Sequence, residues 1–150
     1  MKRTPGGDQF TQIVLNTFRL NGALVAAGGR LVEDLSLSTA RWQVLGMIVD
    51  QKLTVSAIAR RIGLTRQSVQ RTADRLVAEG VASAISNPDH QSAKLYVLTT
   101  MGKKIMAQVK RRQAVWANRI ADGLSLSDFS IAGDLLQTIM NRLEKDNSRG

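Results

Sequence analysis

Residues 54–80 read TVSAIARRIGLTRQSVQRTADRLVAEG, and this stretch sets the architecture of the chain. Apolar residues recur at helical spacing in two blocks, Val55–Ile62 and Arg66–Glu79, which only three residues separate. Thr54 and Thr65 are each placed to cap the helix that follows. A glycine, which can adopt positive φ, follows each block and ends it. The stretch therefore predicts two short helices joined by a tight turn.

The spacing of small and apolar residues in this stretch is typical of a helix-turn-helix. Ala59 is placed where the two helices touch, Gly63 at the turn, and Val69 where it would lock the second helix. In that motif the second helix is presented to the DNA major groove. Two packed core helices without a DNA role are the alternative for this stretch taken by itself.

The second predicted helix has one apolar face and one basic face. The apolar face consists of Val69, Ala73, Leu76 and Val77, and the opposite face of Arg66, Gln67, Gln70, Arg71, Asp74 and Arg75. Glutamine can pair bidentately with adenine, and arginine can pair with guanine or neutralise phosphate. We therefore predict that DNA is bound by the following residues of this helix and its cap: Thr65, Arg66, Gln67, Ser68, Gln70, Arg71 and Arg75.

A β-hairpin is predicted directly after the second helix. Val81–Ser86 and Lys94–Leu98 are β-prone and flank the turn-forming residues 87–92. A helix-turn-helix that runs into such a hairpin is a winged helix-turn-helix. From this wing we expect Gln91 and Lys94 to contact DNA.

Helices are predicted on both sides of the winged segment. They cover about Gln9 to Val25 with a continuation toward Glu33, Thr39 to Asp50 after the cap Ser38, Thr100 to Ala121 after the cap Thr99, and Ser127 to Lys145. The predicted fold is mainly α with a small β-hairpin wing. We expect a single domain over residues 1–150, with a DNA-binding lobe at 36–99 and dimerisation helices at 9–34 and 100–145.

Charge and composition narrow the possible partners. The 150 residues carry 21 Lys and Arg against 12 Asp and Glu, a formal net charge of +9, which attracts polyanions such as nucleic acid or an anionic membrane face. The polar start has no signal-peptide character, and no apolar run is long enough for a bilayer, so we expect a cytoplasmic protein without a membrane partner. The absence of cysteine excludes disulfides and thiolate metal sites.

Enzyme chemistry finds no support in the sequence. We see no nucleophile and base pair, no phosphate-binding glycine loop and no paired carboxylates, so no catalytic residue is proposed. His90 is the only histidine and has no partner at metal-ligand spacing. We therefore expect neither a metal nor another cofactor.

Over roughly Phe10 to Leu143 the chain resembles the multiple-antibiotic-resistance regulator (MarR) family. The motifs that carry the resemblance are LSTARWQVL at 37–45, IARRIGL at 58–64 with Val69, RLVAEG at 75–80, and KLYVLT at 94–99 with Gly102. The resemblance implies a homodimer, formed by the helices at the two chain ends, that binds pseudo-palindromic operators. It also implies a small-molecule effector pocket, for which Trp42 and Trp116 are the candidates.

One departure from the family pattern lies at the tip of the wing. Members typically carry an acidic residue and an arginine two positions on, where this chain has His90 and Ser92. We therefore expect the wing to add less affinity or to read a different sequence. The predicted function is a sequence-specific DNA-binding transcriptional regulator, a repressor released by an effector. A dimeric interaction protein that lost operator binding and a non-specific nucleoid binder are the alternatives.

Overall fold

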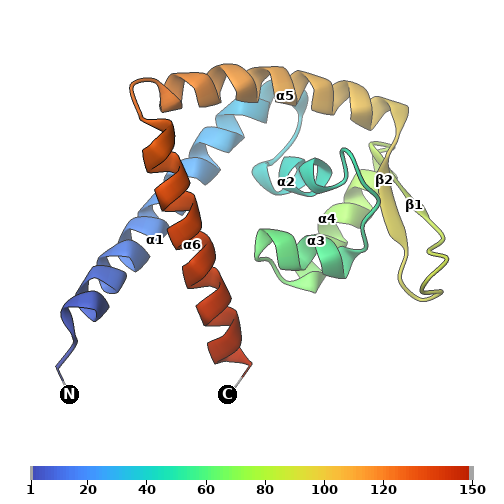
Figure 1. Ribbon diagram of the computed structural model, residues 1–150. Coiled ribbons are helices and arrows are strands. Elements are labelled where there is room, and N and C mark those ends of the chain that lie inside the picture. The colour runs from blue at the N-terminus through green and yellow to red at the C-terminus, as the bar shows by residue number, and fades with distance from the viewer. Residues whose placement is uncertain (1, 149–150) are drawn as a thin grey trace. The chain divides into compact units, whose positions relative to one another are not determined.

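Figure 1 shows the computed structural model, which describes residues 2–148. Its elements in chain order are α1 (Pro5–Val32), the short 3-10 helix η1 (Glu33–Leu35), α2 (Thr39–Met47), α3 (Val55–Ile62), α4 (Arg66–Ala78), β1 (Ala82–Ile85), β2 (Leu95–Leu98), α5 (Thr100–Ala121) and α6 (Leu126–Asn147). The chain divides into two compact units, one up to Gln113 and one from Ala114 on. The predicted class, mainly α with a two-stranded antiparallel wing, is confirmed.

The helix-turn-helix forms because each of its helices is capped by the residue that the sequence indicated. The Thr54 hydroxyl accepts a hydrogen bond from the backbone N–H of Ala57 at 3.2 Å, and Thr65 accepts one from Ser68 at 3.2 Å. Gly63 ends α3 with φ of +68°, a conformation that glycine adopts without steric cost. The predicted bounds of α3 are confirmed, and α4 ends one residue earlier than predicted.

The helix ends outside this motif are partly as predicted. Ser38 caps α2 and Thr99 accepts from the N–H of Gly102, as expected. The predicted start of the first helix at Gln9 is wrong, because Thr4 caps it and Pro5, whose φ suits the first turn, begins it. It continues through Gly28 to Val32. The last helix begins at Leu126 after the cap Ser125, one residue before its predicted start at Ser127, and α2 ends at Met47, three residues before Asp50.

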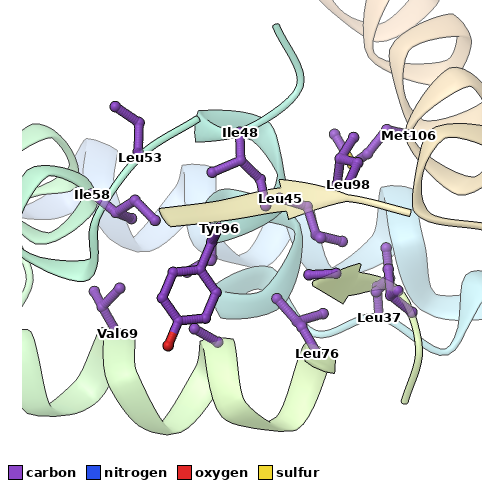
Figure 2. Close-up of a cluster of buried hydrophobic side chains, with 14 of the residues drawn as sticks. Leu37, Leu45, Ile48, Leu53, Ile58, Val69, Leu76, Tyr96, Leu98 and Met106 are labelled. Atoms are coloured by element: carbon purple, nitrogen blue, oxygen red, sulfur yellow. The ribbon is translucent and has the colours of Figure 1, made fainter. Parts of the chain in front are cut away.

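A hydrophobic core holds α2, α3, α4 and the hairpin together (Figure 2). Its most completely buried side chains are Val32, Val44, Leu45, Ile58, Val69, Leu76 and Val109. The prediction that Val69, Ala73 and Leu76 form the inner face of α4 is confirmed. Val77 was expected on that face, but it is 37% exposed because it lies on the flank of α4 toward the hairpin. The core fixes α4 from behind and leaves its opposite side open.

The hairpin is held by contacts with the loop before α3 and with the residues that follow α4. Its strands pair from Ala82 with Leu98 to Ile85 with Leu95, and Tyr96 also pairs with Leu53 in the loop before α3. The hydroxyl hydrogen of Thr99 lies between the carbonyl oxygens of Gly80 and Val81, at 2.7 and 3.0 Å. Two strands alone are marginally stable. These contacts supply the support that the hairpin needs.

A glycine allows α5 to begin close against the hairpin. A Cβ atom added to Gly102 would overlap the carbonyl oxygen of Val81 and lie 3.2 Å from a methyl group of Leu98. Only a residue without a side chain fits this approach. Gly102 therefore sets how the first turn of α5 packs on the start of the wing.

Helices α1 and α6 each carry a stripe of exposed apolar side chains. On α1 these are Phe10, Leu15, Phe18, Leu20, Leu24 and Val25, and on α6 they are Phe129, Ile131, Leu135, Leu136, Met140 and Leu143. Phe18 is 70% exposed. A run of this size is unusual on a surface that faces water permanently.

Candidate nucleic-acid interface

The outer side of α4 is open to solvent along its length. All of the predicted DNA-binding residues of this helix and its cap are exposed, namely Thr65, Arg66, Gln67, Ser68, Gln70, Arg71 and Arg75. The position follows from the local packing, since Val69, Ala73 and Leu76 point into the core and turn the remaining positions outward. The helix is therefore presented as a convex polar rod that a duplex groove could receive.

A groove of about 660 Å³ separates α4 from the hairpin and the start of α3. It brings together four of the predicted contact residues, Arg66, Gln67, Gln70 and Lys94. Thr65, Ser68, Arg71, Arg75 and Gln91 do not line the groove, although all of them are exposed. The predicted residues thus occupy two neighbouring surfaces, the groove and the far flank of α4.

Some of these side chains are already engaged within the protein. Nε2 of Gln70 donates to Oδ1 of Asp74 at 2.7 Å and to the hydroxyl of Tyr96 at 2.9 Å. Nε of Arg75 contacts Oε1 of Glu79 at 3.0 Å, and Glu79 also pairs with Arg41 of α2 at 3.0 Å. These contacts restrict which hydrogen-bonding atoms Gln70 and Arg75 can offer to a ligand.

Other side chains of α4 are free. Within residues 2–148, Arg66, Gln67 and Arg71 form no side-chain hydrogen bond or ion pair with the protein. Gln67 and Arg71 are one helical turn apart and lie farthest from the core face. They can therefore present their full donor and acceptor sets to another molecule.

The wing tip is a compact turn with few charges. The side-chain oxygen of Asn87 accepts from the N–H of Asp89 at 3.0 Å, and the N–H of Ala93 donates to the carbonyl of His90 at 3.1 Å. Gln91 lies within this turn and Lys94 directly after it, and both are exposed. Lys94 is the one cation between residues 86 and 98, so the wing offers a single charge to a phosphate backbone.

The sequence analysis missed two residues that shape this surface. Tyr96 is buried, yet its hydroxyl reaches Gln70, which lies 26 residues earlier. Arg41 crosses from α2 to the end of α4 and also donates to the carbonyl of Ser36 at 2.9 Å. Neither contact has a short-range signature, because each joins elements that only the tertiary fold brings together.

Trp42, one of the two candidates for an effector pocket, lines a second cavity of about 410 Å³. Apolar walls come from Met47, Ile62, Met106 and Val109. The indole N–H of Trp42 is buried and has no hydrogen-bond partner among residues 2–148, and a Cβ at Gly28 would lie 3.1 Å from its ring. Trp116 belongs to the unit from Ala114 on, where it is half-buried, so its part in such a pocket stays a prediction.

Within residues 2–148, no helix combines the length and the hydrophobicity that a bilayer crossing requires. In the same range, no three acidic or histidine side chains gather as a metal site would need.

The structure combines two capped helices joined by a tight turn, an open basic side on the second helix, and a supported hairpin directly after it. Together these features define a winged helix-turn-helix protein of the transcription-regulator class. The comparisons with known proteins agree. The sequence profile of the MarR family matches residues 34–91, and the chain belongs to this family of transcription regulators.

The relatives match over nearly their whole length. The chain is 35% identical over 139 residues to an uncharacterized protein of Mycobacterium bovis, covering 93% of this chain and 97% of that protein. A Mycobacterium tuberculosis protein matches with the same identity and coverage.

Solved structures match with the same fold. The transcriptional regulator PA3341 superposes with a TM-score of 0.78 at 25% identity, over 91% of this chain and 98% of that one. The transcriptional regulator BldR of Sulfolobus solfataricus gives 0.78 at 15% identity, over 90% and 96%. CouR of Rhodococcus jostii, solved with p-coumaroyl-CoA bound, gives 0.77 at 21% identity, over 85% and 90%.

Proposed function

We propose that this protein is a cytoplasmic repressor that binds double-stranded DNA sequence-specifically as a homodimer and is released by a small molecule. The observation that carries the proposal is the open side of α4, where Gln67 and Arg71 have no partner within residues 2–148. Glutamine and arginine are the side chains that read adenine and guanine in the major groove. The net charge of +9 supplies the attraction to the phosphate backbone.

Dimerisation is supported by the apolar stripes on α1 and α6. Phe18 at 70% and Ile131 at 63% exposure would each gain from leaving water. A second copy of the chain offers the same stripes, and a two-fold pair buries both in one step. Two winged lobes in one particle would then read two half-sites of an operator.

Release by an effector is supported by the cavity beside Trp42. Its lining is largely apolar, and Lys110 and Gln113 can hold a polar or anionic group, although the lining also includes the carboxylate of Asp50. CouR, which shares the fold, was solved with a ligand, p-coumaroyl-CoA. An effector of this chain acts only if it binds the DNA-free arrangement more tightly than the DNA-bound one. We propose an aromatic or anionic ligand for this cavity, whose ring would stack on Trp42.

The test starts from DNA of the source genome. Fragments that the purified protein retains are sequenced, and the shared motif is compared with a scrambled duplex of the same composition while the salt concentration rises. A specific regulator keeps its preference for the motif although both affinities fall. We expect a pseudo-palindromic motif and a lasting preference.

Two other outcomes point to the alternatives. If the motif and the scrambled duplex lose affinity together, the protein is a charge-driven, non-specific nucleoid binder. If no duplex is bound, it is a dimeric interaction protein that kept the fold, a reading that the single cation of the wing favours. Either result would overturn the proposal of a sequence-specific repressor.

A further inference from the structure

We propose that Gln70 reads DNA through its amide oxygen alone, and that Tyr96 and Asp74 impose this restriction as positioning residues. The inference rests on the proposed function, because it concerns how α4 recognises a base. A glutamine amide has two N–H hydrogens and one acceptor oxygen. Nε2 of Gln70 lies 2.7 Å from Asp74 and 2.9 Å from Tyr96, so both hydrogens are engaged. Only Oε1 is left for a ligand.

Asp74 determines which way the amide faces. The nitrogen and oxygen of an amide are distinguished by their hydrogen-bond partners. If the amide of Gln70 were turned over, Oε1 would stand 2.7 Å from a carboxylate oxygen, and two acceptors at that distance repel each other. The nitrogen therefore faces Asp74 and Tyr96, and the oxygen faces away from them.

Tyr96 is a fixed support for this arrangement. Its side chain is 5% exposed, and Figure 2 shows its hydroxyl pointing toward α4, the helix that carries Val69 and Leu76. Its backbone N–H donates to the carbonyl of Leu53 at 2.8 Å, and its strand pairs with β1. Because the ring cannot follow a moving amide, Gln70 would have to break one of these hydrogen bonds for each N–H that it offers to a base.

The restriction changes which bases Gln70 can accept. In the major groove adenine and cytosine present an amino group, whereas guanine and thymine present an oxygen at the corresponding place. An acceptor oxygen therefore selects adenine or cytosine on the strand it faces and does not separate the two. A glutamine with free N–H groups also bonds N7 of adenine, and so selects adenine over cytosine. Gln67, on the same helix, has that freedom.

The experiment uses the full-length protein and the selected duplex. Every base pair of one half-site is replaced in turn, and dissociation constants are measured for wild type and Gln70→Ala. The position whose base preference disappears in the variant is the one that Gln70 reads. There we expect wild type to bind adenine and cytosine within about threefold, and guanine and thymine roughly tenfold more weakly.

Removing the hydrogen-bond partners of the Gln70 amide should then change the base preference at that position. In Tyr96→Phe, and more fully in Tyr96→Phe with Asp74→Ala, we expect adenine to be favoured over cytosine by roughly tenfold at that position. Asp89→Asn is the control for charge, because it removes a carboxylate of the wing tip and keeps both partners of Gln70. It should strengthen binding to all duplexes through the lost negative charge and leave the order of bases unchanged. Because Tyr96→Phe keeps the buried ring, we expect this variant to fold.

The failure of this inference is distinct from the failure of the proposed function. The inference is wrong if wild type already favours adenine over cytosine tenfold at the Gln70 position, or if no position depends on Gln70 while others remain selective. In both cases the protein is still a sequence-specific regulator. If no duplex is preferred at all, the inference and the proposed function fail together.

Discussion

The guanidinium of Arg112 donates to both carboxylate oxygens of Asp34, a residue 78 positions earlier in the chain, with Nη2 at 2.7 Å from Oδ2. Nη1 of the same side chain also donates to the carbonyl of Leu31 at 3.1 Å. These bonds join α5 to the segment where α1 ends, immediately before the winged lobe. Hydrogen bonding to Arg112 holds the pKa of Asp34 below its ordinary value, and the same pairing raises the pKa of Arg112.

A small acid-dependent loss of stability should follow from this pair. Because the pKa of Asp34 is lowered in the folded state, the pair stabilises the fold above the carboxyl's ordinary pKa, and the contribution is lost as the pH falls through the lowered value. Asp34→Asn should therefore lower the urea midpoint near neutral pH, and the difference should disappear once the pH falls below the lowered pKa of Asp34. The effect is small because Asp34 is largely exposed to water.

Its control is Asp122→Asn, which removes a carboxylate that forms no ion pair within residues 2–148. That variant should leave the urea midpoint near neutral pH unchanged. If the difference in urea midpoint between wild type and Asp34→Asn persisted in acid, the ionised pair would not be its cause.

Base discrimination should depend on the free side chains of α4. We expect Gln67→Ala and Arg71→Ala each to reduce the difference between the preferred and the substituted base by about 1 to 3 kcal/mol per lost bidentate contact. Competition binding on single-base operator variants measures this. Equal weakening on all duplexes would instead identify the residue as a phosphate contact.

The wing should contribute less to binding than α4. Gln91→Ala and Lys94→Ala should each weaken operator binding less than Arg71→Ala, because the tip offers one cation and no arginine for the minor groove. Lys94→Ala should also reduce the salt slope by about 1, the value for one phosphate contact. A loss as large as that of Arg71→Ala would overturn the view that α4 dominates.

Gly102→Ala should destabilise the fold although it adds only one methyl group. That methyl group would overlap the carbonyl of Val81, so α5 and the hairpin must move apart, at a cost of about 1 to 3 kcal/mol. Chemical denaturation measures the change. Gly46→Ala is the matched control within α2, where no atom lies within 4 Å of the added group. If both variants were equally stable, the close approach at Gly102 would not matter.

The proposed dimer should depend on the stripe of α1. Phe18→Asp places a charge where a 70% exposed ring would be buried on pairing, so we expect monomers at concentrations where wild type is dimeric. Sedimentation velocity distinguishes the two forms. Leu64→Asp, an exposed apolar residue in the turn of the helix-turn-helix, should leave the dimer intact. If Phe18→Asp dimerised as strongly as wild type, the interface would lie elsewhere.

The parts of the fold that depend on neighbouring residues could be predicted from the sequence. Caps such as Thr54 and Thr65 act within three residues of themselves, and the apolar positions of α4 repeat within one or two turns. Where two caps compete, local reasoning fails. Ser125 and Ser127 both stand just before the apolar positions of α6, and the structure has the cap at Ser125.

The interactions that restrict the candidate interface could not be predicted in this way. Gln70 was expected to be a free base reader, but its partner Tyr96 comes from a strand 26 residues away. The same holds for Arg112 and Asp34. Residue type and helical spacing indicate which side chains reach the surface, whereas only the packed structure tells which of their atoms are still available.

Each of the two compact units holds one tryptophan, so intrinsic fluorescence can report on each unit separately. The chain has two tryptophans, with Trp42 in the compact unit that carries the winged lobe and Trp116 in the unit that carries α6. Replacing either one by phenylalanine leaves a single emitter, so intrinsic fluorescence can follow one unit at a time. Quenching of Trp42 on addition of a compound would locate that compound's effect without any attached dye.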